Sequence, residues 1–342
     1  MELNLTKFKT AIAVGAVAGI GVYSMIGAAP SSAADFTMKI GLGTFKDVQH
    51  QWSKWMKEGI EKRSGGRIEV KIFPKSQLGA IPRQIEGVQL GTQAAFVAPA
   101  DFFAGIDPRF GAFSIPVLFK DKKQAASVLH DPDMNKEILS LGKGKGFQVV
   151  SVFTHSVAHY FGGKKPFRRL ADFKGTKLRV NATPAERLKM ARFGASAIPM
   201  PLGEVVPAMQ RGVIDGTMSG TVVYVVFKFN KLGSVLTRTD DTMIISTAMV
   251  SDAWMKRLPK DLQAIVVDEG NKLQKRSSAF SDANEKFMIG LWKKNGGELI
   301  SLPPSDMSKI RGLLADVGAQ VTKGKPALAA FHAKLVATGK KY

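Results

Sequence analysis

The stretch ADFKGTKLRVNATPAERLKMARFGASAIPMPLGEVVPAMQRGVIDGTMS, residues 171–219, decides the fold. Apolar and basic side chains alternate over 176–180, which is the two-residue period of a strand. A helix is predicted to follow, with Thr183 as its N-cap and Pro184 at its first position. The stretch therefore begins as a strand joined to a helix.

The second half of the stretch repeats the order of strand and helix. Gly194 is expected to end the first helix, and a short apolar segment at 198–202 follows it. A second helix is predicted from Glu204 to about residue 211, before the turn at Asp215-Gly216. The order strand, helix, strand, helix, strand is an α/β crossover pattern, whose ligand crevices lie at the carboxyl ends of the strands.

Arg179 is the main candidate for ligand binding. It stands among apolar neighbours near the end of the first strand, where a guanidinium is costly unless it is paired. Its planar fork of donors suits a carboxylate, which lysine cannot grip with two parallel bonds. Two structural alternatives stay open: Arg179 faces solvent, or it pairs with an internal carboxylate such as Glu204.

Short motifs within the stretch, and others along the rest of the chain, carry a family resemblance. Within it are Asp172-Phe173-Lys174-Gly175, Lys177, Arg179-Val180, Gly194-Ala195, Pro199-Met200-Pro201, Glu204-Val205 and Gln210 to Gly216. Elsewhere are Ser64 to Ile68, Phe73-Pro74, Ser76 to Gly79, Val88 to Thr92, Phe110 to Phe119, Trp254 and Leu258-Pro259. The chain thereby resembles the solute-binding proteins of TRAP (tripartite ATP-independent periplasmic) transporters, the DctP-like family.

The resemblance implies a fold and a partner. The fold class is α/β, a two-domain periplasmic binding protein with hinge strands and a long helix that spans both domains. Domain I is expected at 35–155 plus 245–285 and domain II at 156–244 plus 286–342, with the ligand cleft between them. The implied partners are a small-molecule carboxylate ligand and the TRAP membrane permease subunits, driven by an ion gradient. A periplasmic sensor that docks to a membrane receptor is the alternative function.

The chain departs from its relatives at polar positions. Ala158 occupies the place of a second arginine, Ile81-Pro82 replaces an acidic-basic pair, and Ser219 stands where asparagine is common. We therefore expect a monocarboxylate with a largely apolar body, such as an aromatic or branched oxo acid, since a polar wall would stay unsatisfied against it. An apolar wall would then comprise Ile81, Ala158, Leu202 and Tyr224.

Further candidates come from the end of the third predicted strand and the first long helix. The segment 98–103 is expected to line the cleft with backbone groups and an aromatic ring. Trp52 stands at a helix start, where it either faces the ligand or packs between helices. The candidate ligand-binding residues are Arg179, Ser219, Trp52, Pro99, Asp101, Phe102, Ala158, Met200, Leu202 and Tyr224.

Composition limits the function classes. The 342 residues are 45% apolar and 23% charged, which suffices for two domains, and the absence of cysteine excludes disulfides and thiol chemistry. The net charge of +21 suggests anionic partners, but basic residues cluster only in pairs such as Lys122-Lys123, which argues against nucleic acid.

The first 34 residues read as a secretory signal peptide. Lys7 and Lys9 precede an apolar run at 11–28, and small residues follow up to a predicted cleavage after Ala34. We expect export to the periplasm. An uncleaved membrane anchor is the alternative, because the run reaches the lower length limit for a membrane span.

No motif predicts an enzyme, a metal or a cofactor. The run 142–146 lacks the Gly-Lys-Ser/Thr ending of a phosphate loop, and 216–220 places its serine one position late for a nucleophile elbow. His155 and His159 lie in a segment predicted to be extended, which separates them too far to share a metal ion.

The remaining elements follow from periodicity and turn residues. Strands are predicted at 36–42 and 67–73, and a helix-and-strand pair at 81–97. Extended crossings between the domains are expected at 154–163 and 243–250. A long helical tract should run from Trp254 to about Trp292, broken only at Gly270 and Gly290.

Overall fold

A computed structural model describes residues 34–181 and 183–342 of the chain. The predicted signal peptide, apart from Ala34, lies outside the described residues. In the described part, no helix is both long and apolar enough to cross a membrane.

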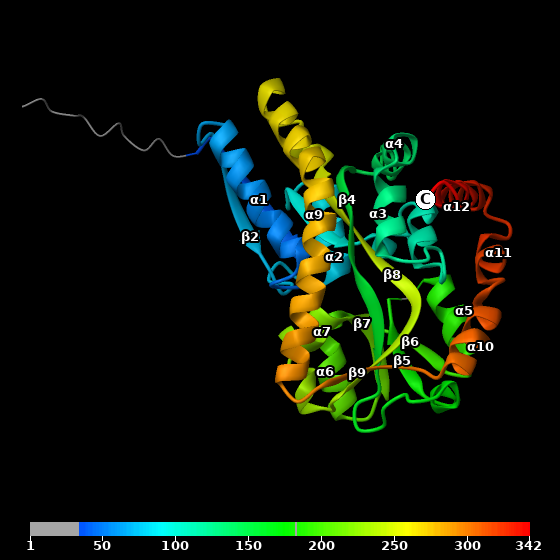
Figure 1. The fold of residues 1–342 in the computed structure, drawn as a ribbon. Helices are drawn as coiled ribbons and strands as arrows, with labels where there is room; N and C mark the ends of the chain where they lie inside the picture. The colour runs from blue at the N-terminus through cyan, green and yellow to red at the C-terminus, as the bar shows by residue number, and fades with distance from the viewer. Residues whose placement is uncertain (1–33, 182) are drawn as a thin grey trace, which may run out of the picture. The chain divides into compact units, whose positions relative to one another are not determined.

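One mixed sheet runs through the described residues (Figure 1). Its strands follow the order β2-β1-β3-β8-β4-β7-β5-β6, and β9 pairs with β8. At one end β2, β1 and β3 are parallel, and at the other end β7, β5 and β6 are parallel. The strands are β1 (Phe36–Leu42), β2 (Ile68–Phe73), β3 (Ala95–Pro99), β4 (Phe147–Phe161), β5 (Lys177–Val180), β6 (Ser196–Pro199), β7 (Gly216–Gly220), β8 (Val235–Ser251) and β9 (Glu298–Ser301).

The antiparallel pair β4 and β8 joins the two parallel ends. β8 pairs with β3 through Ser246–Val250, while β4 pairs with β7 through Ala158–Phe161. The ladder between β4 and β8 contains three register shifts, the last between Val157 and His159. The predicted segment 243–250 is therefore extended within β8, and the predicted segment 154–163 is extended as far as Phe161, where β4 ends.

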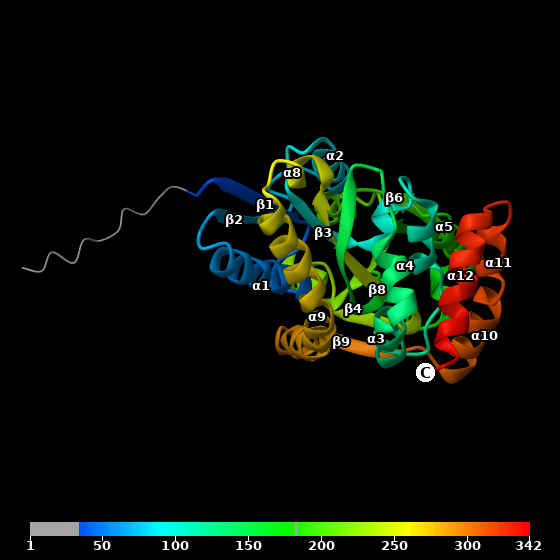
Figure 2. The same cartoon turned by 90° about the horizontal axis from the view of Figure 1, so that it is seen from above.

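Helices cover the sheet (Figures 1 and 2). α1 and α9 pack together, and α9 lies along β4. The helices are α1 (Val48–Arg63), α2 (Ile81–Leu90), α3 (Lys122–His130), α4 (Pro132–Leu139), α5 (Pro184–Arg192), α6 (Val205–Gln210), α7 (Thr221–Val226), α8 (Asp252–Met255), α9 (Lys260–Lys294), α10 (Pro304–Leu314), α11 (Val317–Thr322) and α12 (Pro326–Gly339). Short 3₁₀ helices are η1 (Ala100–Phe103), η2 (Pro108–Ser114), η3 (Leu170–Phe173), η4 (Leu202–Glu204) and η5 (Phe229–Lys231).

The predicted breaks in the long helix are wrong. α9 is continuous over 35 residues, and Gly270 and Gly290 both lie inside it. A Cβ added at Gly270 would lie 2.7 Å from the Cβ of Val150, so this glycine lets the helix approach β4 closely. The break falls earlier, at Pro259, which caps the start of α9 and separates it from α8.

The stretch 171–219 folds largely as predicted. The Thr183 side chain accepts a hydrogen bond from the backbone N–H of Glu186, and Pro184 opens α5. After the helix, Gly194 adopts a φ of 72°. The third strand, β7, begins at Gly216, so this glycine lies in the strand and not in the predicted turn at Asp215-Gly216, and 221–226 continues as the helix α7.

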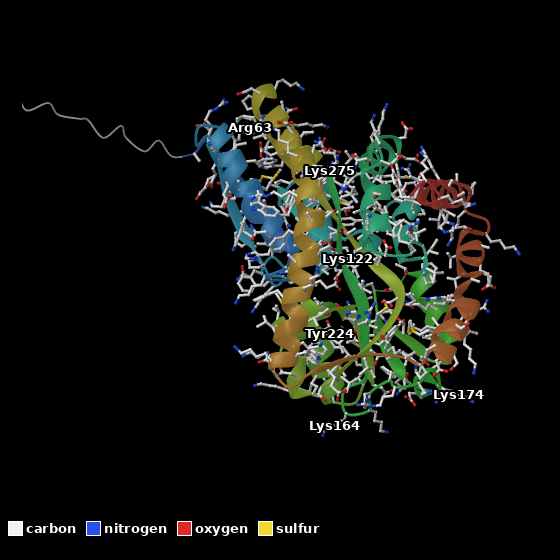
Figure 3. The ribbon with its side chains drawn as sticks, viewed as in Figure 1. Arg63, Lys122, Lys164, Lys174, Tyr224 and Lys275 are labelled. Atoms are coloured by element: carbon white, nitrogen blue, oxygen red, sulfur yellow. The ribbon has the colours of Figure 1, made fainter. Side chains whose placement is uncertain are left out.

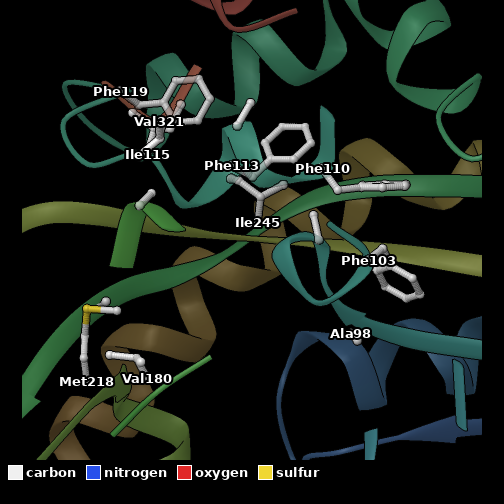
Figure 4. Close-up of a cluster of buried hydrophobic side chains, with 14 of the residues drawn as sticks. Ala98, Phe103, Phe110, Phe113, Ile115, Phe119, Val180, Met218, Ile245 and Val321 are labelled. Carbon is white, nitrogen blue, oxygen red and sulfur yellow. The ribbon is translucent and has the colours of Figure 1, made fainter. Parts of the chain in front are cut away.

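Three apolar clusters hold these elements. The largest contains Phe103, Phe113 and Ile245 and reaches from the η1 and η2 segments to Val180 and Met218 (Figure 4). A second packs α1 and α9 against β1, β2 and β3, and a third packs α6 and α7 against Trp292 of α9. Each cluster buries apolar surface, the dominant favourable contribution to folding.

Candidate functional site

A cavity lies where strand ends from both parallel regions meet. Its walls include the residues that follow β1, β3 and β5, the end of β7, and the middle of β4 and β8. This agrees with the rule that ligands bind at the carboxyl ends of strands. The lining residues are Gly43, Thr44, Gln49, Ile81, Ala98, Pro99, Asp101, Phe102, Phe113, Ser114, His155, Ser156, Arg179, Asn181, Glu186, Leu202, Met218, Ser219, Gly220, Val222, Val223, Thr242, Met243, Ile244 and Ile245.

Arg179 is held in this cavity by its strand and by one backbone carbonyl. It lies in β5 between β6 and β7, and only 3% of its surface is exposed. Its Nε donates to the carbonyl oxygen of Met200 over 3.0 Å. Within the described residues its Nη2 has no hydrogen-bond partner and Arg179 forms no salt bridge, so Glu204 does not pair with it.

The electrostatics of Arg179 favour an anionic partner. Burial lowers the pKa of its guanidinium, while the charges of Glu186 and Asp101 oppose that effect. An unpaired buried donor of a charged group costs about 1–3 kcal/mol or more. A ligand carboxylate that accepts from Nη2 would relieve this cost.

Two acids and an amide lie on the same side of the cavity. Asn181 Nδ2 donates to Asp101 Oδ2 over 3.1 Å, and the Asn181 backbone N–H donates to Glu186 Oε2 over 2.9 Å. Burial raises the pKa of Asp101, although Asn181 and Arg179 lower it. Burial, with the charge of Asp101, raises the pKa of Glu186 to about 7, against the effect of Lys189.

A second polar group forms the wall near β1. Gln49 Nε2 donates to Ser246 Oγ over 2.9 Å, and Ser246 Oγ lies 3.1 Å from His155 Nδ1. His155 Nε2 lies 3.2 Å from Asp47 Oδ2. Thr44 Oγ1 donates to the same Asp47 carboxylate. Thr44, Gln49 and Ser246 are paired within this group, and in the described residues no cluster of three or more metal-ligating side chains is placed to hold an ion.

A buried ion pair lies behind the cavity. Lys189 Nζ, on α5, lies 3.3 Å from Asp241 Oδ2 and donates to Thr242 Oγ1 over 2.6 Å. Tyr160 Oη and Thr239 Oγ1 also donate to the Asp241 carboxylate. Both side chains of the pair are fully buried, and neither lines the cavity.

The structure brings six of the ten sequence-derived candidates together at the cavity and leaves four outside its lining. Those in the lining are Arg179, Ser219, Pro99, Asp101, Phe102 and Leu202. Trp52 is fully buried in the second cluster, where its Nε1 donates to Ser151 Oγ. Tyr224, labelled in Figure 3 near α9, is fully buried, and its hydroxyl donates to the His159 carbonyl.

Ala158 and Met200, the other two candidates outside the lining, are in contact with other parts of the protein. Ala158 is buried in β4 and pairs with Gly220 of β7. Met200 contributes its carbonyl oxygen to Arg179, and its side chain packs against the third cluster. The apolar wall expected from four residues thus contains Ile81 and Leu202 but neither Ala158 nor Tyr224.

Sequence reasoning missed the polar residues that accompany Arg179. Asn181 follows it by two positions, at the end of the same strand, which is a usable signal for a cleft residue. Glu186 is the third residue after the N-cap Thr183 and lies in the first turn of α5, where an acid is common at any helix start, so the sequence gives no separate signal for its position at the cavity. The sequence pattern raises His155 only as a candidate metal ligand, yet it lines the cavity.

Comparison with known proteins identifies the family. A sequence model described as "Bacterial extracellular solute-binding protein, family 7", DctP, matches residues 43–323. The chain belongs to the DctP family. DctP-family proteins are solute-binding components of TRAP transporters, which bind small carboxylates and work with membrane permease subunits. This confirms the resemblance and the two-domain α/β fold class.

Relatives and solved structures of the DctP family extend over most of the chain. A "Solute-binding protein" of Verminephrobacter eiseniae is 30% identical over 303 residues, 87% of this chain and 89% of the relative. The 2,3-diketo-L-gulonate-binding periplasmic protein YiaO of Escherichia coli is 26% identical, over 83% of this chain and 85% of that protein.

Among structures, a TRAP periplasmic solute-binding protein of Desulfovibrio salexigens with bound orotic acid is 26% identical. It has a TM-score of 0.81 and covers 89% of this chain and 98% of its own. A TRAP solute-binding protein of Sulfurospirillum deleyianum with bound succinate, 21% identical with a TM-score of 0.82, shares the fold and covers 89% of this chain and 99% of its own.

Proposed function

We propose that this DctP-family protein captures a monocarboxylate with a largely apolar body in the cavity around Arg179. It then delivers the bound anion to a TRAP-type permease driven by an ion gradient. The observation that carries the proposal is the Nη2 of Arg179, a buried cationic donor without a partner among the described residues. The solutes named for the relatives, orotate among them, are organic acids, which supports a carboxylate at this position.

The charge of the cavity supports one carboxylate rather than two. Arg179 is the only lysine or arginine among the described residues that line it. A second ligand carboxylate would find no second lysine or arginine in this lining and would lie near Asp101 or Glu186 or against neutral side chains, and an unpaired buried anion is costly.

Apolar side chains support the body of the proposed ligand. Ile81, Phe102 and Leu202 line the cavity together with Met243 and Ile244. Burying apolar ligand surface against them contributes about 25 cal/mol per Å². A rigid apolar acid would therefore be bound at one end by Arg179 and along its length by these side chains.

The proposal includes closure and export. Domain I (35–155 plus 245–285) and domain II (156–244 plus 286–342) would close on the ligand by bending at β4 and β8. The cavity lining supports this division because it takes residues from both ranges, such as Asp101 and Arg179. The first 34 residues would direct the chain to the periplasm, and the protein would bind its solute without catalysing a reaction.

Isothermal titration of the mature chain tests the proposal. The protein is unfolded and refolded first, to remove carried-over ligand, and titrated with mandelate, phenylpyruvate and orotate, and with succinate and malate. We expect a monocarboxylate to bind at least tenfold more tightly than either dicarboxylate. Tight binding of succinate or malate, or binding of none of the acids, would overturn the proposal.

A further inference from the structure

Three hydrogen-bond acceptors stand beside Arg179 in the cavity. They are the carboxyl groups of Asp101 and Glu186, which accept when ionised, and the amide oxygen of Asn181, and all three residues belong to the lining. A ligand with a single carboxylate and an apolar body would supply acceptors to Arg179 but no donor to this group. The acceptors would therefore favour a ligand with a hydrogen-bond donor, a preference that Arg179 cannot provide.

The orientation of the Asn181 amide is determined by its neighbour. Its Nδ2 donates to Asp101 Oδ2 over 3.1 Å, and a carboxylate accepts only from the nitrogen end of an amide. The Oδ1 of Asn181 is thus directed away from Asp101, and it is buried without a hydrogen-bond partner in the described residues. A buried carbonyl oxygen without a donor is costly, so a donor from the ligand would satisfy it.

The two acids are held in place by Asn181 and by the elements in which they lie. Glu186 Oε2 accepts from the Asn181 backbone N–H over 2.9 Å and lies 3.4 Å from Thr183 Oγ1, in the first turn of α5. Asp101 lies in η1, after the end of β3, and accepts from the Asn181 side chain. Their positions are fixed by secondary structure, which makes them precise partners for a small polar group.

We propose that Asp101, Asn181 and Glu186 form an acceptor subsite that recognises an N–H or O–H donor next to the ligand carboxylate. The inference rests on the proposed function, since Arg179 must hold the carboxylate for its neighbour to face these residues. The ligand class is then a 2-hydroxy acid, or a carboxylate whose adjacent ring nitrogen carries hydrogen. A 2-oxo acid, which offers only an acceptor at that position, belongs to the rejected class.

The subsite would discriminate against ligands that leave its acceptors without a hydrogen-bond donor. A ligand that lacks the donor leaves Asn181 Oδ1 and a carboxylate oxygen desolvated and unsatisfied, whereas a ligand with the donor satisfies them. Sites built to hydrogen-bond a substrate OH or NH reject analogues without it far more strongly than apolar pockets reject a missing methylene. When ionised, Asp101 and Glu186 also repel a second carboxylate, in agreement with Arg179 being the one lysine or arginine among the described lining residues.

Matched ligand pairs test the inference by isothermal titration. Orotate is compared with 1-methylorotate, and mandelate with its O-methyl ether, 2-methoxy-2-phenylacetate, and with phenylacetate. The methylated acids keep the carboxylate and lose the donor, and phenylacetate loses it without added bulk. We expect the better-bound donor acid to bind at least tenfold more tightly than each of its comparators, while equal affinities within both sets would overturn the inference.

Variants locate the preference in the subsite. The preference is the ratio of the affinity for the donor acid to the affinity for its comparator. In Asp101→Asn and in Glu186→Gln this ratio should fall from at least tenfold to about threefold or less. The melting temperature of each variant reports its folding. Glu58→Gln, a change at an exposed carboxylate on α1, is the matched control and should keep the full preference. A preference retained in both subsite variants would also overturn the inference.

Arg179→Ala separates this inference from the proposed function. If that change weakens the binding of every acid, and the unchanged protein still binds donor acids more tightly than their comparators, both the proposed function and the acceptor subsite stand. If it weakens the binding of every acid, but the unchanged protein binds donor acids and their comparators equally, only the acceptor subsite is rejected. If affinity for every acid is unaffected, or if none of the acids binds the unchanged protein, the proposed function fails and the acceptor subsite fails with it.

Discussion

Arg179 and Lys189 are both buried cations on consecutive elements, β5 and α5, and they differ in how they are paired. Lys189 lies 3.3 Å from Asp241 and donates to Thr242, so its charge is compensated inside the protein. Arg179 donates through Nε to the carbonyl of Met200 and leaves Nη2 without a partner in the described part of the chain. A complete pair indicates a structural role, and an incomplete one indicates a place for a ligand.

Lys189→Met should have the largest effect on stability. It leaves Asp241 buried and negative, and breaking a buried pair by removing one partner costs about 3–5 kcal/mol. The free energy of unfolding, measured by urea denaturation, should fall by that amount. The double change Lys189→Met with Asp241→Asn should recover part of the loss, because the uncompensated charge is gone. A loss below about 1 kcal/mol for the single change would show that the pair is not a structural one.

Arg179→Ala should reduce ligand affinity more than it reduces stability. Affinity for a carboxylate ligand should fall at least tenfold, about 1.4 kcal/mol or more, because a charge-assisted contact is lost. The free energy of unfolding should change less than in Lys189→Met, since no salt bridge of Arg179 is broken. Arg179→Lys keeps the charge without the planar fork, and its affinity should be intermediate. Unchanged affinity in Arg179→Ala would remove this residue from the site.

The charges of Arg179 and Lys189 both act on Glu186, a buried acid whose titration makes stability dependent on pH. Burial raises its pKa from 4.5 to about 7, so between these pH values the folded protein binds a proton that the unfolded chain has released. Stability therefore falls as pH rises from about 4.5 to 7, by an amount on the order of 1–3 kcal/mol. Burial of His159, which lowers its pKa to about 4, acts in the opposite direction below pH 6.5.

The contribution of Glu186 is isolated by a variant. The difference in unfolding free energy between the unchanged protein and Glu186→Gln, measured by urea denaturation at pH 5 and pH 7.5, removes the His159 contribution. Relative to the variant, the unchanged protein should lose stability on going to pH 7.5. A difference that is constant between the two pH values would mean that the carboxyl has an ordinary pKa.

Tyr160→Phe should have the smallest effect. Its hydroxyl donates to Asp241 over 3.2 Å, and Lys189 and Thr239 still contact that carboxylate after the change. The free energy of unfolding should fall by about 1 kcal/mol. Ligand affinity, measured by titration, should stay within twofold, because Tyr160 does not line the cavity. A large loss of affinity would connect the Asp241 group to binding.

Local pattern predicted most of the fold. The alternation at 36–42, the N-cap at Thr183 and the strand that carries Arg179 are all visible in short windows, because they depend on neighbours in the sequence. The continuity of α9 was not predictable in this way. Gly270 looks like a helix breaker in sequence, but it is retained because Val150 of β4 leaves no room for a side chain there.

The candidate site was predictable where position along a strand decides exposure to the cleft. Pro99, Asp101 and Arg179 follow or end strands whose carboxyl ends meet at the cavity. Trp52 and Tyr224 carry polar groups that suggest a ligand contact, yet these groups bond to Ser151 and to a backbone carbonyl. Which face of a helix meets a cavity depends on tertiary packing, which periodicity alone does not specify.

A crystal structure of the complex with the tightest-binding acid is the most direct test of the role of Arg179. The predicted result is a ligand carboxylate oxygen within about 3 Å of Arg179 Nη2, with the Nε bond to Met200 retained. A carboxylate bound away from Arg179, or an Nη2 turned to Asp101 or Glu186 in the presence of ligand, would contradict it.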